Sequence, residues 1–268
     1  MAGQGRHHPA IACFFYSFEF CKIPQRLAKP APNYKNQPVS LRKNMLKVID
    51  LEKNYGPLKV LKQVSLEVLE GEVVSVVGAS GAGKSTLLQI LGTLDTPDAG
   101  EVMLKGKKYT ALKGDEMARF RNREIGFVFQ FHNLLPEFTA FENICLPGYI
   151  GKKPIAEVEH RATELMALLG ISSRKMHKPS ELSGGEQQRT AVARALVNSP
   201  AIVFADEPSG NLDSRNADDL HRLFFRLRKE LGQSFVIVTH NSEFAQMADR
   251  VIEIQDGYIK GAVRKQQN

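Results

Sequence analysis

The sequence predicts an α/β protein with a largely parallel sheet, helices on both of its faces, and a helical lobe inserted into it. Strand-like apolar runs alternate with helical stretches along most of the chain, which is typical of parallel α/β folds. Several runs are wholly apolar, as expected of strands that are buried on both faces. The stretch from about 131 to 185 has no strong strand run, and this interruption predicts the inserted lobe.

The expected elements follow in order from residue 45. Strands are expected at 46–54, 58–69, 73–77, 125–129, 201–206, 234–239 and 250–254. A glycine-rich loop and a helix over about 84–93 follow the third strand. Pro154 and Gly170 match the usual start and stop residues of a helix. A later helix is predicted by an apolar stripe at helical spacing, formed by Leu220, Leu223, Phe224, Leu227 and Leu231.

Residues 1–44 differ in composition from the rest of the chain. They contain five of the 13 prolines, and seven Lys or Arg residues against Glu19 alone, which gives them +6 of the chain's net +7. The remaining residues carry +1, so we expect no nucleic-acid partner. A strand-like pattern begins abruptly at Met45. We interpret residues 1–44 as a leader, either untranslated with Met45 as the functional start or a genuine disordered tail.

The sequence indicates neither a disulfide framework nor a membrane span. Two of its three cysteines lie in the leader, and no metal-ligand spacing connects them. The longest apolar stretch of the leader, AIACFFYSF at 10–18, is too short to cross a bilayer. We therefore expect a soluble or peripheral protein in a reducing compartment.

A phosphate-binding loop follows the buried strand at 73–77. Its sequence GASGAGKST fits the pattern G-x-x-x-x-G-K-[ST]. Its glycines let backbone N–H groups turn toward an anion, while Lys84 reaches the β- and γ-phosphates and Ser85 offers a hydroxyl to Mg²⁺. An ordinary glycine-rich turn is the alternative, but the strand–loop–helix context favours phosphate binding. The expected nucleotide contacts are Gly78, Ala79, Ser80, Gly81, Ala82, Gly83, Lys84, Ser85 and Thr86.

Four polar residues follow the ends of apolar strands. Asp206 and Glu207 follow the run AIVFA, and they are candidates to hold Mg²⁺ and to orient or deprotonate the attacking water, respectively. Gln130 closes IGFVFQ, and His240 closes FVIVTH. Singly, each could be a strand-end residue with a structural role. Because the carboxyl ends of parallel strands meet at one sheet edge, together they predict a site for water, Mg²⁺ and the γ-phosphate.

The segment ELSGGEQQRTAVARAL at 181–196 predicts an amphipathic helix with two adjacent glycines in its first turn. Each glycine costs up to about 1 kcal/mol relative to Ala in a helix. Ser183 and Glu186 fit a capping box, which explains the helix start but needs neither Gly184 nor Gly185. An anion held on bare N–H groups at the positive end of a helix would need them.

Together these motifs resemble the ATP-binding subunit of ABC transporters. The resemblance rests on GASGAGKS, Gln130, LSGGEQQR, VFADEP, GNLD and His240 in this order, and it covers residues 45 to about 262. It implies a P-loop NTPase cassette with a RecA-like, mostly parallel sheet core, an antiparallel β subdomain and an inserted α-helical subdomain. It also implies an ATPase that uses ATP and Mg²⁺, with residues 45–268 as its nucleotide-binding domain.

The resemblance also implies roles for single residues. Tyr55 would stack on adenine, Gln130 would sense Mg²⁺ and the membrane partner, and Asp206 would be the Walker B aspartate that holds Mg²⁺. Glu207 would be the catalytic base, and His240 the switch histidine at the γ-phosphate. The chain has DEPSG where relatives often have DEPTG, and THN where THD is common, and neither difference touches a matched position.

In this family the signature sequence LSGGEQQR binds the γ-phosphate of ATP that is held by the other subunit. The resemblance therefore implies a homodimer with two composite ATP sites, and separate integral-membrane subunits on which the cassettes dock. The residues implied on the signature side of each site are Ser183, Gly184, Gly185 and the D-loop residue Asp213. Candidates for a groove that receives a partner helix, or alternatively for the core of the lobe, are Phe131, Leu134, Leu135, Phe138 and Phe141.

Within the family, QFHNLLPEFTAFEN, PSELSGGEQQR and ARALVNSPAIVFADEPSGNLD are most similar to the lipoprotein-releasing type. That similarity implies two permease subunits, lipoproteins as cargo, and a peripheral location on the cytoplasmic face of the bacterial inner membrane. The cell-division type and the macrolide-export type are alternatives, although the latter carries a fused membrane domain. A soluble ABC ATPase without a transporter is a remoter alternative, and a kinase or GTPase would leave LSGGEQQR and His240 unexplained.

Overall fold

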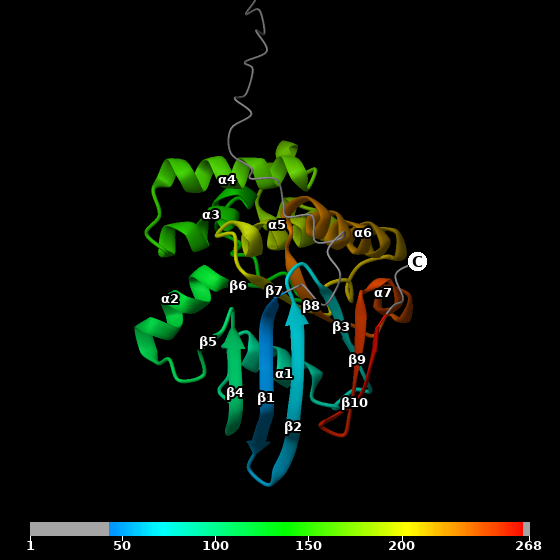
Figure 1. Ribbon diagram of the computed structural model, residues 1–268. Helices are drawn as coiled ribbons and strands as arrows, with labels where there is room; N and C mark the ends of the chain where they lie inside the picture. The colour runs from blue at the N-terminus through cyan, green and yellow to red at the C-terminus, as the bar shows by residue number, and fades with distance from the viewer. Residues whose placement is uncertain (1–42, 265–268) are drawn as a thin grey trace, which may run out of the picture. The chain divides into compact units, whose positions relative to one another are not determined.

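The computed structural model describes residues 43–264, and Figure 1 shows their fold. The predictions for residues 1–42, which form nearly all of the expected leader, lie outside the described residues. The first strand begins at Asn44, and Met45 is buried in the core. The strand-like pattern of the sequence and the first strand of the structure therefore coincide.

A four-stranded antiparallel sheet contains the first two strands. Alternate residues of its first strand, such as Leu46 and Val48, are buried, as expected of a sheet with one face on the core. This sheet corresponds to the antiparallel β subdomain of the expected cassette. Its strands, in the order β2-β1-β4-β5, are β1 (Asn44–Tyr55), β2 (Leu58–Leu69), β4 (Ala99–Leu104) and β5 (Lys107–Lys108).

A second, mostly parallel sheet has the strand order β10-β9-β3-β8-β7-β6. Only β10 is antiparallel to its neighbour, with which it forms a hairpin. Successive residues point to opposite faces, so Val74 and Val76 lie in one buried cluster and Val73 in the other. The strands are β3 (Val73–Val77), β6 (Ile125–Val128), β7 (Ile202–Asp206), β8 (Ser234–Val238), β9 (Arg250–Gln255) and β10 (Tyr258–Arg264).

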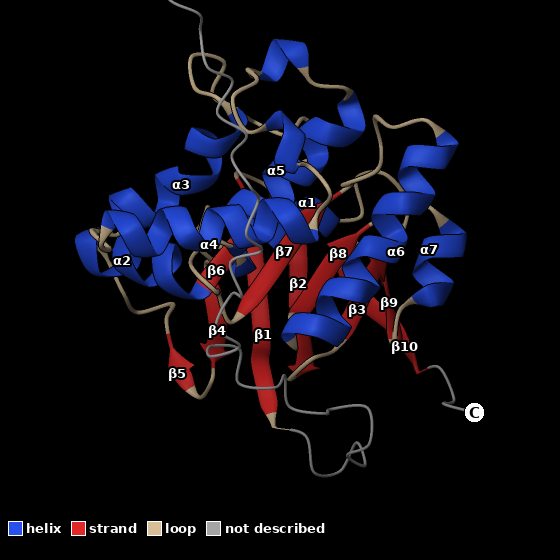
Figure 2. Ribbon diagram, turned by 90° about the horizontal axis from the view of Figure 1, so that it is seen from above, coloured by secondary structure: helices blue, strands red, loops and turns tan. Residues whose placement is uncertain are grey.

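Helices cover the two faces of this sheet, as predicted, but unequally. On one face α1 packs together with the four-stranded sheet, since Leu87 and Leu88 share a buried cluster with Val48 and Val76. Most of the other helices cover the opposite face, where Figure 2 shows them from above. The helices are α1 (Lys84–Leu91), α2 (Gly114–Glu124), α3 (Ala140–Ile150), α4 (Ile155–Leu168), α5 (Gly184–Leu196), α6 (Ser214–Leu231) and α7 (Ser242–Met247).

The chain between β6 and β7 is helical, as the interruption of the strand pattern predicts. It contains α3, α4, two 3-10 turns (Ser172–Arg174 and Pro179–Glu181) and α5. Thr139 caps α3 through a capping box with Glu142. No helix within residues 43–264 is long and apolar enough to cross a membrane. The structure also contains elements that the sequence patterns do not predict, namely β4, β5, β10, α2 and α7.

Candidate active site

The glycine-rich loop connects β3 to α1, where the sequence predicts a phosphate-binding loop. Gly78 has a φ of 152°, and a Cβ atom there would lie 2.1 Å from the carbonyl oxygen of Ile254, so no side chain fits. Gly83 caps α1 in a left-handed conformation with a φ of 102°. A Cβ atom on Gly81 would meet open space, so that glycine is required by its φ of 77° and not by crowding. The loop thus has the backbone of an anion cradle.

Lys84 lies inside this loop. Its Nζ atom donates hydrogen bonds of 2.9 Å to the carbonyl oxygens of Gly78 and Ala79, and its side chain is buried. Burial lowers the pKa of Lys84 from its ordinary value, and the nearby carboxylates of Glu207 and Asp206 oppose this shift. A buried cation aimed into a loop of backbone amides is well placed to meet phosphate oxygens.

Ser85 and Asp206 are brought together from distant parts of the sequence. The Oγ atom of Ser85 donates to Oδ1 of Asp206 over 3.3 Å. Asp206 ends β7, opposite Val238 of β8, and burial raises the pKa of its carboxyl group. A hydroxyl and a carboxylate side by side are the oxygen donors that Mg²⁺ prefers, so these two residues fit the predicted metal site.

Glu207 leaves the strand in a strained conformation. Its φ is 44°, which is uncommon for a residue with a side chain, and its N–H donates to the carbonyl oxygen of Val238 over 3.0 Å. The N–H of His240 donates to Oε2 over 3.2 Å, while Oε1 lies 3.3 Å from Nε2 of His240. Burial raises the pKa of Glu207 above its ordinary value, which suits a base that operates near neutral pH.

Gln130 is near this edge but is engaged elsewhere. Its Nε2 atom donates to Oδ1 of Asn211 over 3.1 Å, and Nδ2 of Asn211 donates to the carbonyl oxygen of Gln130 over 3.3 Å. A Cβ atom on Gly210 would lie 2.8 Å from Nε2 of Gln130. The structure therefore places the Gln130 amide against the turn after Glu207 and not on the Ser85–Asp206 pair.

Tyr55 ends β1 beside the start of α1. Its hydroxyl donates to Oδ2 of Asp95 over 2.6 Å, and it also interacts with the Thr86 side chain. Lys53 pairs with the other oxygen of Asp95 at 2.8 Å, and its Nζ atom lies 5.0 Å from the centroid of the Tyr55 ring. Tyr55 is 47% exposed as a residue. It is therefore a held but accessible surface on which a base could stack.

The signature segment begins α5 with the predicted capping box. The N–H of Ser183 donates to Glu186 over 2.8 Å, and the N–H of Glu186 donates to the Ser183 hydroxyl over 3.3 Å. The Arg174 guanidinium, 2.7 Å from Glu186, and the Ser183 N–H lower the pKa of this carboxyl to about 2. The start of α5 is thus fixed by charge as well as by hydrogen bonds.

The two signature glycines differ in a way that the sequence does not show. A Cβ atom on Gly185 would lie 2.6 Å from Oδ1 of Asn216 in α6, so helix packing within the chain already excludes a side chain there. A Cβ atom on Gly184 would meet only Leu212, at 3.5 Å, an ordinary contact. The sequence predicts that an approaching anion explains both glycines. Packing against Asn216 already accounts for Gly185, so only Gly184 still requires the anion as an explanation.

Asp213 caps α6. Its carboxylate accepts the Asn216 N–H at 2.9 Å and the Asn216 side-chain amide at 2.6 Å. Within residues 43–264, no hydrogen bond or salt bridge joins Ser183, Gly184, Gly185 or Asp213 to the phosphate loop. The predicted residues thus form two groups. The sheet-edge group lies around the phosphate loop and comprises Tyr55, the loop itself, Gln130, Asp206, Glu207 and His240. The signature group lies at the N-terminal starts of α5 and α6 and comprises Ser183, Gly184, Gly185 and Asp213.

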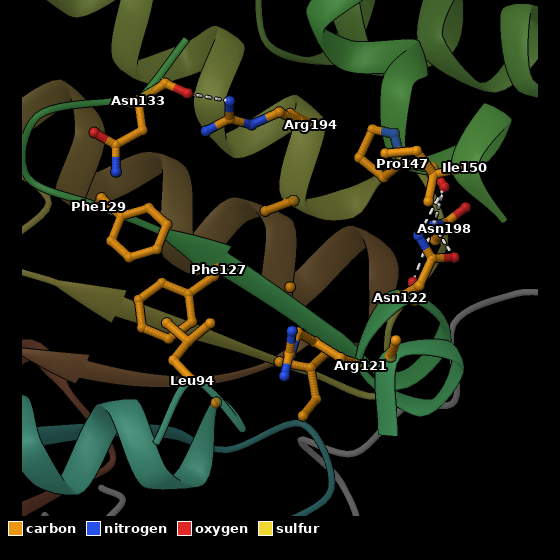
Figure 3. Close-up of a pocket in the computed structure, with 15 residues that line it drawn as sticks. Leu94, Arg121, Asn122, Phe127, Phe129, Asn133, Pro147, Ile150, Arg194 and Asn198 are labelled. Atoms are coloured by element: carbon orange, nitrogen blue, oxygen red, sulfur yellow. Dashed lines mark hydrogen bonds between the residues drawn. The ribbon is translucent and has the colours of Figure 1, made fainter. Parts of the chain in front are cut away.

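A cavity of about 490 Å³ lies between α2, β6, α3 and α5. Figure 3 shows Phe127 and Phe129 on one side of it and Pro147 and Ile150 on the other. The rings of Phe127 and Phe129 stack with centroids 4.3 Å apart. Arg194 lines the same cavity and donates to the carbonyl oxygen of Asn133 over 2.5 Å. Of the residues expected in a partner groove, Phe131 is 72% exposed and Leu135 and Phe138 are also exposed, whereas Phe141 packs against the core.

Comparison with known proteins agrees with this fold. A family model described as "ABC transporter" matches residues 61–210, more than half of the chain. The chain belongs to the ABC transporter family of ATP-binding cassettes. Two similar relatives are proteins named "Lipoprotein-releasing system ATP-binding protein LolD" from Cytophaga hutchinsonii and Bacteroides thetaiotaomicron, 58% and 56% identical. The alignments cover 80% and 81% of this cassette chain, and 98% and 99% of those proteins.

Solved ABC cassettes have the same fold. One is the dimeric structure of a post-hydrolysis state of the cassette MJ0796 bound to ADP and Pi, which is 39% identical with a TM-score of 0.76 and covers 84% of this chain and 100% of that chain. Another is cbiO1 from Clostridium perfringens, part of the ABC transporter complex cbiONQ, which is 27% identical with a TM-score of 0.76 and covers 82% and 88%. The predicted cassette fold and its assignment as an ABC ATPase are confirmed.

Several supporting residues escape the sequence motifs. Lys53 and Asp95 hold Tyr55, Arg174 holds the signature capping box, and Asn211 holds Gln130. His221 contacts Ser209 in the turn after Glu207.

Proposed function

We propose that this ABC ATPase powers the release of lipoproteins from the bacterial inner membrane toward the outer membrane. It works as a homodimer, bound peripherally at the cytoplasmic face to integral-membrane subunits of the LolC/LolE type, and its cofactors are ATP and Mg²⁺. The observation that carries this proposal is the near-complete coverage of LolD proteins at more than half identity. Those proteins carry the lipoprotein-releasing name, and their alignments with this chain span almost their whole length.

The sheet-edge group supports the hydrolytic role. The phosphate loop and Lys84 hold the phosphates, and Tyr55 stacks on the adenine ring. Ser85 and Asp206, already 3.3 Å apart, would hold Mg²⁺, and Gln130 would join them after leaving Asn211. When bound, Mg²⁺ would neutralise charge on the transferred phosphoryl group.

Two further side chains act at the reacting end of the nucleotide. Glu207 accepts a proton from the attacking water, a role that its raised pKa supports. His240 contacts the γ-phosphate and keeps the Glu207 carboxylate oriented through the contacts described above. Together they place the base and a γ-phosphate contact at one sheet edge.

The signature group supports the dimer. In one chain it has no hydrogen bond to the phosphate loop within residues 43–264, and Gly184 leaves the backbone at the start of α5 bare. A second copy related by a two-fold axis would bring this helix start to the γ-phosphate held by the first copy. Asp213 at the start of α6 would approach the same site.

The cavity lined by Phe127, Phe129 and Ile150 supports docking of a permease helix. Its walls are mostly apolar, with arginine and asparagine side chains among the lining, and the exposed Phe131 follows the lining residue Phe129 by two positions in the sequence. A cytoplasmic helix of each membrane subunit would enter one such cavity per cassette.

The proposal is tested by co-purification from the native host. The full chain with Glu207→Gln and a C-terminal tag is purified from membranes in mild detergent at saturating ATP and Mg²⁺. Membrane subunits with large external domains, accompanied by lipoproteins, are expected. Cell-division proteins would move the assignment to an FtsE-like role, and macrolide-export partners to a MacB-like one. Absence of any membrane partner would contradict a transport role and favour a soluble ABC ATPase.

A surface variant tests the docking site in the same experiment. Ile150 lines the cavity and is 71% exposed, so Ile150→Asp is expected to release the membrane subunits at little cost in stability. Ile155→Asp is the matched control, because Ile155 is 64% exposed but lies outside the cavity lining. Equal retention of the membrane subunits by both variants would contradict docking at the cavity.

A further inference from the structure

A buried histidine outside the motifs joins two segments of the active site. His221 lies in α6, and its side chain is 3% exposed. Its Nε2 atom is 3.0 Å from Oγ of Ser209. Its ring stacks on the ring of Phe244, with centroids 4.1 Å apart and 13° between the planes. One side chain therefore contacts two segments that are far apart in the sequence.

The first of these segments is the turn at 207–212, which carries Glu207. Backbone hydrogen bonds of 3.0 and 3.1 Å close this turn. Asn211 within the turn exchanges two hydrogen bonds with Gln130. The Ser209 hydroxyl ties the middle of this turn to His221 of α6. This contact limits how far the turn that carries Glu207 can move.

The second segment is α7, which begins two residues after His240. The Phe244 N–H donates to the cap side chain of Asn241 over 2.8 Å, and the Phe244 ring is fully buried. A helix of six residues has little stability of its own, so the packing of this ring fixes the position of the helix. The stack on His221 thereby constrains the backbone that leads back to His240.

The imidazole is suited to both contacts in its neutral form. Burial lowers the pKa of His221, against a smaller opposite effect of the Asp218 carboxylate. A neutral imidazole has one donor and one acceptor nitrogen, and a hydroxyl can pair with either. A neutral ring also stacks on Phe244 without the cost of burying a charge.

We propose that His221 is a positioning residue for ATP hydrolysis, which aligns the segment of Glu207 with the segment of His240 by holding Ser209 and Phe244 together. This inference rests on the roles proposed above for Glu207 and His240. Neither contact of His221 involves the phosphate loop or Tyr55. Loss of the His221 side chain should therefore lower kcat and leave the KM for ATP nearly unchanged.

The test uses substitutions that separate the two contacts. His221→Phe keeps an aromatic ring on Phe244 and removes the hydrogen bond, while Ser209→Ala removes the hydroxyl. His221→Gln restores a polar side chain that can reach the hydroxyl. Steady-state ATP hydrolysis by the purified full chain gives kcat and KM, and thermal unfolding gives the stability of each variant.

His221→Phe and Ser209→Ala are each expected to lower kcat about fivefold, the size expected for one neutral hydrogen bond, with KM within about twofold of the wild type. The double variant Ser209→Ala with His221→Phe is expected to be no slower than the slower single variant, because both remove the same contact. His221→Gln is expected to recover part of the lost kcat. Independent effects that multiply in the double variant would overturn the proposal.

Phe225→Leu is the matched control. The Phe225 ring packs edge-on against Phe244 with centroids 6.0 Å apart, farther than the stacked His221 ring at 4.1 Å. Leucine keeps an apolar side chain at this position, and the stack of Phe244 on His221 is retained. This variant should lose stability but keep kcat. A general effect of destabilisation would instead lower kcat in Phe225→Leu and His221→Phe alike, and that result would overturn the proposal.

Failure of the inference is distinguishable from failure of the proposed function. If Glu207→Gln is inactive while His221→Phe keeps the wild-type kcat, only the positioning role of His221 is wrong. If Glu207→Gln hydrolyses ATP at the wild-type rate, the role proposed for Glu207 is wrong, and the inference falls with it.

Discussion

The carboxylate of Glu207 lies against His240: its Oε2 atom accepts the backbone N–H of His240 at 3.2 Å, and its Oε1 atom lies 3.3 Å from the imidazole Nε2 atom. The same carboxyl group has a pKa raised by burial above its ordinary value of 4.5. Orientation by a neighbour and a raised pKa are the two properties that a general base needs.

The rate of hydrolysis should therefore fall with decreasing pH at values above 4.5. Only the deprotonated carboxylate accepts a proton, and a raised pKa moves its protonation toward neutral pH. Glu207→Gln should lower kcat by about 100-fold or more at pH 7 while ATP still binds. The acid limb of a pH–rate profile of kcat, where the rate falls as the pH decreases, measures this effect. A limb at or below pH 4.5, or a Gln variant with more than a tenth of wild-type kcat, would contradict this role.

The signature glycines provide a matched pair of variants. Gly185→Ala should destabilise the fold by about 1–3 kcal/mol, because its methyl group would meet Asn216 at 2.6 Å. Gly184→Ala should leave stability within about 1 kcal/mol, since a methyl group fits there. If Gly184 faces the partner's nucleotide, Gly184→Ala in the Glu207→Gln background should nevertheless lose the ATP-dependent dimer on a sizing column.

A second substitution separates packing from ligand binding at Gly185. Asn216→Ala removes the amide that crowds Gly185 and leaves only a Cβ atom, 3.6 Å away. Combined with Gly185→Ala, it should recover part of the lost melting temperature. No recovery would show that contacts other than the Asn216 amide require the glycine.

The capping box of α5 should make stability depend on pH in the acid range. The pKa of Glu186 is about 2 in the folded chain, below its ordinary value of 4.5, because Arg174 and the Ser183 N–H stabilise the carboxylate. This stabilisation is complete above about pH 4.5 and is lost as the pH falls toward 2. Glu186→Gln should cost about 1 kcal/mol at pH 7, and the gap from wild type should close over that range in urea unfolding.

The control for this prediction is Glu142→Gln at the start of α3. Glu142 forms the same kind of capping box with Thr139, but it has no salt bridge among the described residues. Its variant should show a smaller dependence on pH. An equal dependence in both variants would show that the contact with Arg174 contributes nothing.

The adenine platform predicts a difference between two substitutions of Tyr55. Tyr55→Ala removes the ring and should raise the KM for ATP about tenfold, the effect of one lost base–aromatic stack. Tyr55→Phe keeps the ring but loses the 2.6 Å hydrogen bond to Asp95, and it should change KM by less than about threefold. An equal change of KM in both variants would mean that the hydroxyl, and not the ring, serves the nucleotide.

Much of the fold could be predicted from the sequence because its central strands are buried on both faces. The runs VVSVV and SFVIV are almost wholly apolar, and no surface helix has that pattern. The helix α2 could not be predicted, because GDEMARFRNRE buries only Phe120 and has no apolar stripe. The strands β4 and β10 lie partly exposed toward sheet edges, and their mixed sequences AGEVML and YIKGAVR resemble loops.

The candidate site could be predicted only in part, for a related reason. Motif residues such as Asp206 and His240 follow apolar strands, so local sequence places them at one sheet edge. The residues that hold other motif side chains come from elsewhere in the chain. Asp95, which holds Tyr55, is 40 residues away from it, and Asn211, which holds Gln130, is 81 residues away from it. Only the three-dimensional fold shows that Asn216 crowds Gly185, so the sequence could not separate the two glycines.

The parallel pairing of the central strands makes strand length a stricter requirement than strand composition. Val76 and Asp206 both pair with Val238, and Ala205 pairs with Val128, so the phosphate loop, Gln130, Asp206 and His240 leave the sheet at one level. Exchanging one apolar side chain for another leaves that level unchanged, whereas deleting a single residue inside a strand would turn every following side chain to the opposite face. Apolar residues of these strands can therefore be exchanged for one another, while insertions and deletions are tolerated in the connections between strands, such as the helical lobe between β6 and β7, and not within the strands.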